Sequence, residues 1–141
     1  SATTNLVPLV MKAALGVSGP VQVFGNDYPT PDGTGIRDYI HVEDLARAHV
    51  AALDYLAAGG ASTTLNLGTG VGSSVLDILD RTANEAGHEV PYEIVERRVG
   101  DPAVVFADPS AAERVLGWTS ELTLDDIVQS AYAWHASQVS N

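Results

Sequence analysis

Segments with helical and extended patterns alternate along this chain, separated by stretches rich in glycine and proline. Residues 5–15 carry a helical pattern that the stretch 16–20 ends. Residues 21–24 alternate like a short strand, and residues 25–35 are rich in the residue types that favour loops. Because alternating strands and helices form α/β folds, the 141 residues are predicted to form one α/β domain.

The second half of the chain continues this alternation. Residues 63–67 predict a strand that runs into a turn at 68–72, after which Ser73 or Ser74 can cap a helix that continues to Ala86. The other expected elements are extended residues at 37–42, a helix at 43–58, a strand at 91–96 and an irregular or extended stretch at 97–106. Asp108 and Pro109 are expected to begin a helix that ends at Gly117. A capping-box pattern at Thr123 and Asp126 begins a last helix, which continues to about residue 137.

The expected helix at 43–58 is apolar around most of its circumference. A helix with this distribution is usually buried on more than one side. Two arrangements satisfy that need: the helix packs against a region outside this chain, or its alanines allow close packing within the chain. The apolar residues are Leu45, Ala46, Ala48, Val50, Ala51, Ala52, Leu53 and Leu56.

The chain is strongly acidic, and this charge argues against several classes of partner. Its net charge is -11 with only seven lysines and arginines, so its field repels nucleic acids and anionic membranes. No apolar run approaches the roughly 20 residues that span a bilayer, and no signal peptide is expected. The lack of cysteine fits a reducing, cytoplasmic location. The histidines lack metal-ligand spacing, so no metal site is predicted.

Two features of the sequence could bind an anion. The turn Gly68–Gly72 joins an expected strand to a helix, as a dinucleotide fingerprint does, but Ser73 replaces the third glycine. A tight strand-to-helix turn is therefore the preferred interpretation. Arg37 and the pair Arg97 and Arg98 lie on separate segments, and guanidinium groups match phosphate oxygens in shape and charge. From these residues alone, the arginines either clamp a diphosphate or belong to the ordinary charged surface.

Longer motifs around the arginines resemble one enzyme family. Residues 23–46 read VFGNDYPTPDGTGIRDYIHVEDLA, and NLGTG follows at 66–70. RRVGDPA at 97–103 and LGW at 116–118 come later in the same family order. Together these motifs resemble the UDP-glucose/UDP-galactose 4-epimerases, which are extended short-chain dehydrogenase/reductases. The resemblance covers essentially the whole chain.

The resemblance implies a fold class and a domain assignment. In this family an N-terminal Rossmann domain holds NAD, and a smaller C-terminal portion binds the UDP-sugar. Residues 1–141 are expected to be that α/β substrate-binding portion, without most of the Rossmann domain. About residues 37–70 are expected to pack against the missing Rossmann sheet. The Rossmann domain is then a partner of this chain, and the isolated chain is expected to form homo-oligomers.

The resemblance also implies a reaction that this chain does not complete alone. The family interconverts UDP-glucose and UDP-galactose: bound NAD takes a hydride from sugar C4, the 4-keto sugar turns over, and the hydride returns to the other face. The family's base is the tyrosine of a Tyr-x-x-x-Lys pair, but no tyrosine here has a lysine four residues later. We therefore expect an NAD-dependent isomerase as the parent protein, and a chain that alone holds no NAD and is inactive.

A set of residues matches the family's substrate-binding positions. A valine replaces a tyrosine that closes the sugar pocket in some members, so UDP-N-acetylhexosamines are expected to fit as well as UDP-hexoses. The resemblance assigns Asn5, Arg37 and Arg98 to the diphosphate, Leu6 to the neighbourhood of the nucleotide, Tyr39 to a place beside Arg37, Gln22 and Phe24 to the uracil pocket, Asp101 to the ribose hydroxyls and Val105 to the sugar pocket.

Two other functions stay open on the sequence. A related nucleotide-sugar enzyme, such as a UDP-pentose epimerase or a UDP-glucuronate decarboxylase, shares the arginines and the general layout. The loop DYPTPDGT at 27–34 favours the hexose epimerases or their pentose relatives. Alternatively, the chain acts alone as a non-catalytic module that binds a sugar nucleotide. Binding of UDP-glucose without NAD would favour the module, and no binding would favour an incomplete half.

Overall fold

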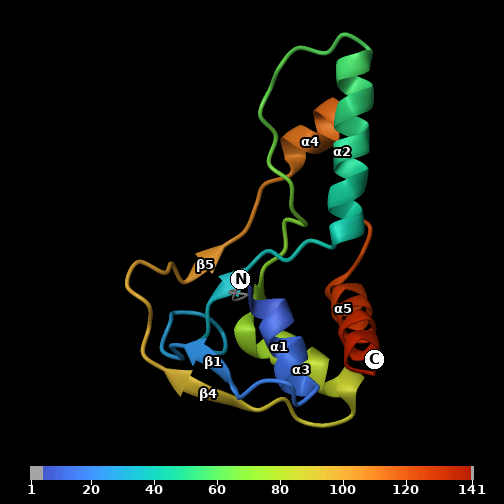
Figure 1. Ribbon diagram of the computed structural model, residues 1–141. Coiled ribbons are helices and arrows are strands. Elements are labelled where there is room, and N and C mark those ends of the chain that lie inside the picture. The colour runs from blue at the N-terminus through green and yellow to red at the C-terminus, as the bar shows by residue number, and fades with distance from the viewer. Residues whose placement is uncertain (1–4, 141) are drawn as a thin grey trace.

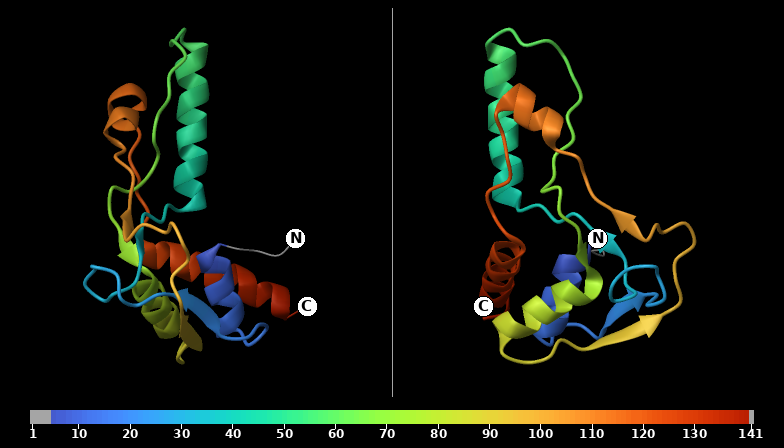
Figure 2. Two further views of the ribbon diagram at one scale, coloured as in Figure 1. Left: turned by 90° about the vertical axis from the view of Figure 1, so that its left-hand side faces the viewer. Right: turned by 180° about the vertical axis from the view of Figure 1, so that it is seen from behind.

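The computed structural model describes residues 5–140 and arranges them as a body from which an arm projects (Figure 1). Figure 2 shows from two further sides that the longest part of the arm points away from the body. The helices of the body are α1 (Leu6–Ala14), α3 (Val75–Ala86) and α5 (Leu124–Val139), and those of the arm are α2 (Val42–Ala57) and α4 (Ser110–Leu116).

The body has a core between its helices and a parallel pair of strands. The three body helices pack against one another, and β1 (Val21–Phe24) pairs in parallel with β4 (Tyr92–Val95). Side chains alternate across a strand, so Val21 and Val23 of β1 point into the core while Gln22 points outward. The buried core residues are Val10, Ala13, Ala14, Val21, Val23, Ile78, Leu79 and Val90.

A second, very short sheet lies where the arm joins the body. Its central strand β2 (Ile36–Arg37) pairs antiparallel with β3 (Ser73–Ser74) and parallel with β5 (Val104–Val105). Although each strand has only two residues, the sheet joins three segments that are far apart in the sequence. It therefore fixes the end of the 25–35 loop against the start of α3 and against the stretch before α4.

The arm has a small core that leaves one side of α2 uncovered. Ala48, Ala112 and Trp118 are its buried residues. Of the α2 residues, only Asp44 and Ala48 are buried, whereas Leu53 on the outer face is 66% exposed. The alanine-rich packing within this chain therefore does not bury α2 on more than one side. Of the two arrangements that the sequence left open, burial by packing within the chain is not found among the described residues, and packing against a region outside it stays a prediction.

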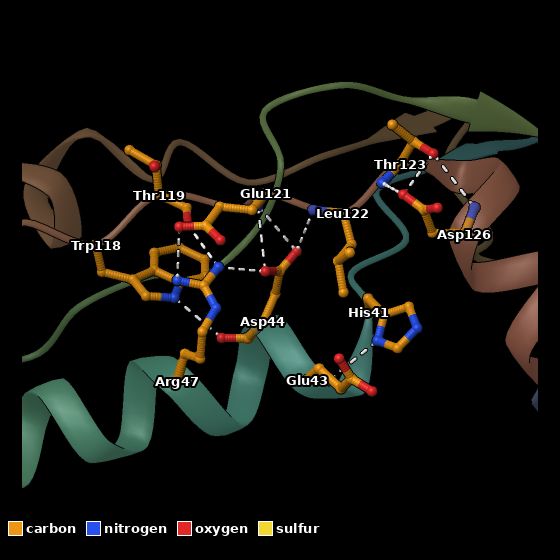
Figure 3. Close-up of polar contacts among 10 residues, drawn as sticks. All are labelled: His41, Glu43, Asp44, Arg47, Trp118, Thr119, Glu121, Leu122, Thr123 and Asp126. Carbon is orange, nitrogen blue, oxygen red and sulfur yellow. Dashed lines mark hydrogen bonds and ion pairs between the residues drawn. The ribbon is translucent and has the colours of Figure 1, made fainter.

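A buried carboxylate holds the base of the arm to the body (Figure 3). Asp44 accepts hydrogen bonds from the amide N–H groups of Glu121 at 3.1 Å and Leu122 at 3.0 Å, and it pairs with Arg47. Trp118 donates from Nε1 to the carbonyl oxygen of Asp44 at 3.0 Å. Burial disfavours the charge on Asp44, but the Leu122 amide, the Arg47 guanidinium and the Glu121 amide outweigh it and lower the pKa of Asp44 below 3.8.

Local capping signals explain why the helices begin and end where the sequence predicted. Ser74 accepts from the Asp77 amide at 3.0 Å to begin α3, and Gly87 ends it with a φ of 76°. Thr123 and Asp126 form the predicted capping box of α5. The predicted helices therefore agree with α1 to α5 within a few residues at each end. Within residues 5–140, no helix is both long enough and apolar enough to cross a membrane.

The strand predicted at 63–67 is not formed within the described part of the chain. These residues form no hydrogen-bonded ladder with the described residues. The extended prediction at 37–42 is also too long, since β2 ends at Arg37 and α2 begins at Val42. A strand is defined by its partner, so a local sequence pattern predicts it less well than a helix.

Candidate functional site

One cleft in the body brings together most of the residues predicted for a ligand site. Its volume is about 1170 Å³, and α1, the end of β1, the segment after β2, and α5 surround it. Arg37 and Arg98 border the same cleft, so the fold unites two cations that are far apart in the sequence. The predicted residues along its walls are Asn5, Leu6, Gln22, Phe24, Arg37, Tyr39, Arg98 and Asp101.

Arg37 reaches the cleft from the central strand of the short sheet. Its Nη1 donates to the carbonyl oxygen of Ile36 at 2.7 Å, and the side chain is half-buried. Among the described residues, no carboxylate lies within ion-pair distance of this guanidinium. The chain has 18 acidic residues, so a half-buried arginine without one of them nearby is unusual here. Its remaining N–H donors are available for an anion.

Arg98 borders the cleft from the segment between β4 and β5. Its guanidinium lies over the Phe24 ring, 4.5 Å from the ring centroid, and Nε donates to Oδ2 of Asp101 at 2.8 Å. The neighbouring Arg97 instead lies over Tyr28 at 4.1 Å and donates to Asp27. Of the two adjacent arginines, Arg98 is therefore the one that faces the cleft. The aromatic ring and the carboxylate together hold its guanidinium in place.

The other predicted residues line the cleft from separate elements. Asn5 precedes α1 and makes no side-chain capping bond, so its amide is not used by the helix. Gln22 projects from β1 and is exposed. Burial raises the pKa of the Tyr39 phenol, and the nearby Arg37 charge only partly opposes that shift, so Tyr39 stays neutral at ordinary pH. This wall therefore offers neutral hydrogen-bonding groups beside two cations.

Val105 is the predicted residue that does not line the cleft. It lies on β5, is 47% exposed, and pairs in register with Arg37 on β2. Residues paired across neighbouring strands project from the same face of a sheet, so Val105 lies on the face that carries the Arg37 side chain. Its predicted place at a sugar pocket stays a prediction.

The cleft also has a wall that the sequence did not predict. Ser130, Ala131, Trp134 and His135 of α5 line it. His41 lines it too, and its Nε2 lies 2.9 Å from the Ser130 hydroxyl. The capping box predicted the start of α5, but no signal showed which face of that helix would meet the cleft.

Comparison with known proteins places the chain in a family. A family model described as GDP-mannose 4,6 dehydratase matches residues 1–131. The chain belongs to this family. A UDP-glucose 4-epimerase from Bifidobacterium longum is 52% identical over 130 residues, which are 92% of this chain and 38% of that protein. The chain spans between 38% and 41% of the length of the curated relatives that it matches.

The structure of this chain is also similar to parts of solved structures of related enzymes. The crystal structure of a UDP-glucose 4-epimerase from Stenotrophomonas maltophila, with bound NAD and formylated UDP-arabinopyranose, matches with a TM-score of 0.94 and 48% identity. The match covers 98% of this chain and 41% of that chain. The UDP-Glc/GlcNAc 4-epimerase from Campylobacter jejuni matches with a TM-score of 0.86 and 36% identity over 97% of this chain and 42% of that one. The chain is thus similar to part of each enzyme.

The glycine turn of this GDP-mannose 4,6 dehydratase family member does not suit a dinucleotide. The amide N–H groups of Thr69 and Gly70 donate to the Asp38 carboxylate, each at 3.0 Å to Oδ2. A phosphate would need these same donors. The turn leads into β3 and α3, whereas the strand predicted before it is not formed within the described residues. The described residues of the turn do not fit the pyrophosphate of NAD.

A second hollow of about 320 Å³ lies in the arm and has a different character. It separates α2 from the extended residues that follow it, and apolar side chains such as Leu56, Leu65 and Leu116 line it. No arginine or carboxylate is among its lining residues. This hollow therefore lacks the arginines that favour a phosphate in the first cleft.

Proposed function

We propose that this chain is the UDP-sugar-binding portion of a UDP-hexose 4-epimerase. The observation that carries the proposal is the half-buried Arg37, which has no carboxylate partner among the described residues and shares one cleft with Arg98. Two guanidinium groups in a half-enclosed cleft suit a diphosphate, because charge-assisted hydrogen bonds strengthen away from bulk water. The UDP-arabinopyranose derivative bound to the similar Stenotrophomonas maltophila enzyme supports the same ligand class.

Each wall of the cleft then has a separate task in binding. Phe24 offers an apolar ring as a wall for the uracil base, with Gln22 beside it. Asp101 accepts from the ribose hydroxyls while its bond to Arg98 keeps that cation directed toward the diphosphate. Asn5 adds a neutral donor at the start of α1. The sugar is then held by its nucleotide, which leaves its ring free to turn.

In the complete enzyme, NAD bound by the Rossmann portion would supply the hydride chemistry at sugar C4. The residues of this chain bind and orient the UDP-sugar, and the cofactor and the catalytic tyrosine and lysine come from the Rossmann portion. Two observations support this division: no tyrosine here precedes a lysine by four residues, and the glycine turn is filled by Asp38. We therefore expect no turnover and no NAD binding by this chain alone.

The Rossmann portion also explains the uncovered side of the arm. Val50, Leu53 and Leu56 of α2 are 58%, 66% and 53% exposed, and residues 63–67, which carry a strand pattern, form no ladder with the described residues. In α/β proteins, helices bury their apolar faces against a parallel sheet. A segment with a strand pattern can pair with the edge of that sheet. We propose that residues 37–70 complete the Rossmann sheet, as the resemblance implied.

Calorimetric titration of UDP into the complete enzyme tests the proposal. We expect saturable binding, and Arg37→Ala and Arg98→Ala should each weaken it about tenfold or more, the size of one lost charge-assisted hydrogen bond. Arg114→Ala is the matched control, because Arg114 is an exposed arginine on α4 outside the cleft and its loss changes the net charge equally. Equal effects of all three substitutions would contradict a diphosphate site.

The sugar that the parent enzyme accepts follows from residue 105. We propose that Val105, beside Arg37 on the sheet, leaves room for a 2-acetamido group. The similarity to the Campylobacter jejuni UDP-Glc/GlcNAc 4-epimerase agrees with this proposal. In the complete enzyme, turnover of UDP-GlcNAc alongside UDP-glucose is expected. Good turnover of UDP-glucose without any of UDP-GlcNAc would contradict it.

A further inference from the structure

The carboxylate of Asp38 is a junction between three segments of the chain. Oδ1 accepts from the Thr69 hydroxyl at 2.6 Å, and Oδ2 accepts from the Gly70 amide at 3.0 Å. Oδ2 also accepts from the Ala107 amide at 3.3 Å. One side chain at the end of β2 thus binds the glycine turn and the stretch that follows β5.

Close packing around this junction explains a glycine. A Cβ atom at Gly68 would lie 2.6 Å from Oδ2 of Asp38 and 2.6 Å from Cβ of Ala107, which no side chain tolerates. Gly68 therefore allows the turn to approach both other segments at once. The amide N–H groups of the glycine motif at 68–72 donate to a carboxylate of the same chain, whereas the amides of similar turns donate to a bound anion.

The junction lies directly beside residues of the cleft. Asp38 is flanked by Arg37 and Tyr39, which both line the cleft, and Ala107 follows β5, whose Val105 pairs with Arg37. The sheet that carries Arg37 has strands of only two residues, so its ladder supplies few hydrogen bonds. The carboxylate adds bonds at the ends of these strands, where the ladder stops.

We infer that Asp38 is a positioning residue for the cleft: its carboxylate locks β2, the glycine turn and the segment after β5 together, and so holds Arg37 in place for a diphosphate. The inference deepens the proposed function and rests on it for the identity of the ligand. The mutual placement of the three segments does not depend on the ligand and is tested separately.

The first measurement is amide hydrogen exchange in the ligand-free chain. Asp38→Ala removes every acceptor of the junction, so exchange of the Gly70 and Ala107 amides should accelerate about tenfold or more relative to core amides of α3. Asp38→Asn should restore most of the protection, because its amide oxygen can replace Oδ2 and its NH2 can donate to the Thr69 hydroxyl. Unchanged exchange in Asp38→Ala would overturn the inference.

The second measurement is the dissociation constant of the complete enzyme for UDP, compared with a control variant that also removes a structural carboxylate. Asp44→Ala also removes a carboxylate that binds backbone amides, but Asp44 lies outside the cleft lining. We expect Asp38→Ala to weaken UDP binding about tenfold and Asp44→Ala to leave it within about twofold, at temperatures where both are folded. Equal weakening by both variants would show a general loss of structure and would overturn the positioning role.

Thr69 supplies a milder variant if Asp38→Ala fails to fold. Thr69→Val removes the hydroxyl that donates to Oδ1 and accepts from the Val71 amide, whereas Thr69→Ser keeps it. Thr69→Val should accelerate exchange at Gly70 and weaken UDP binding several-fold, and Thr69→Ser should match the wild type. If the wild-type complete enzyme does not bind UDP, that result counts against the proposed function, while the exchange rates of the ligand-free chain still decide the role of Asp38.

Discussion

At the scale of the residue, the cleft depends on how each charged side chain is held. Arg98 is held by an aromatic ring and a carboxylate, and Arg37 by a backbone carbonyl and the strand that carries it. Both guanidinium groups are thus ordered before a ligand arrives, which lowers the entropy lost on binding. An arginine replaced by lysine at either position would keep the charge but lose the planar fork.

Val105 gives a prediction at this scale. Val105→Tyr in the complete enzyme adds a ring on the sheet face that carries Arg37. We expect turnover of UDP-GlcNAc to fall at least about tenfold while turnover of UDP-glucose changes little, since only the larger sugar would meet the ring. Steady-state kinetics with both substrates measure this ratio. Val105→Ile, which adds one methylene, should lie near the wild type, and an equal loss for both sugars would count against a steric gate.

Asp44 gives a prediction about acid stability. Its folded pKa lies below the ordinary value of 3.8, so its charge stabilises the fold fully above that value and loses this effect as pH falls through the folded pKa. Asp44→Asn cannot lose a charge, so its stability should fall less between about pH 5 and pH 3 than that of the wild type. Urea denaturation across this range measures the difference. Parallel losses in both proteins would contradict a role for the Asp44 charge.

At the scale of the element, α5 joins the stability of the body to the shape of the cleft. Its first turn is closed by the capping box, in which the Thr123 amide donates to Asp126 at 2.7 Å and the Asp126 amide donates to Thr123 at 3.2 Å. Further along, Ser130 and Trp134 line the cleft. A change at the cap therefore affects a helix that forms part of the candidate site.

Thr123→Ala should lower the free energy of unfolding by about 0.5–2 kcal/mol, because it leaves the first-turn N–H of Asp126 without its acceptor. Thr123→Ser keeps the hydroxyl and should cost much less. Urea denaturation of the three proteins at one pH gives the comparison. If the alanine variant unfolds at the wild-type midpoint, the box contributes nothing to the fold.

The elements also show which parts of the fold a sequence can reveal. Helices were predictable because their signals are local, such as Ser74 before α3 and Gly117 after α4. The pairing of β2 with β5 and the junction at Asp38 were not, because they depend on segments that meet only in the folded chain. For the site, family motifs supplied the arginines, whereas nothing in a helical pattern indicates that Trp134 faces a cleft.

At the scale of the whole molecule, the exposed apolar face of α2 and the net charge of -11 have opposite effects on self-association. Contiguous apolar surface favours association, and uniform negative charge opposes it. Since the face is local and the charge is screened within about 10 Å at ordinary salt, we expect association to prevail as salt rises.

Sedimentation measurements at low and high salt test this expectation on the isolated chain. Leu53→Glu places a charge in the middle of the apolar face and should shift the chain toward monomer. Val17→Glu is the control, because Val17 is also exposed, at 52%, but lies outside the arm. A chain that stays monomeric at every concentration, or two variants with equal effects, would argue against α2 as the contact surface.

The parallel pairing of β1 with β4 has a consequence for the order of assembly. Val21 cannot pair until Tyr92 has been synthesised, because parallel strands cannot be joined by a tight turn. Their pairing therefore closes a long loop of chain. Phe24 is synthesised well before Arg98, so the contact between its ring and the Arg98 guanidinium can form only later. During synthesis the cleft is therefore completed late, only after α5 has emerged. Folding of this region should be slow for a chain of its size.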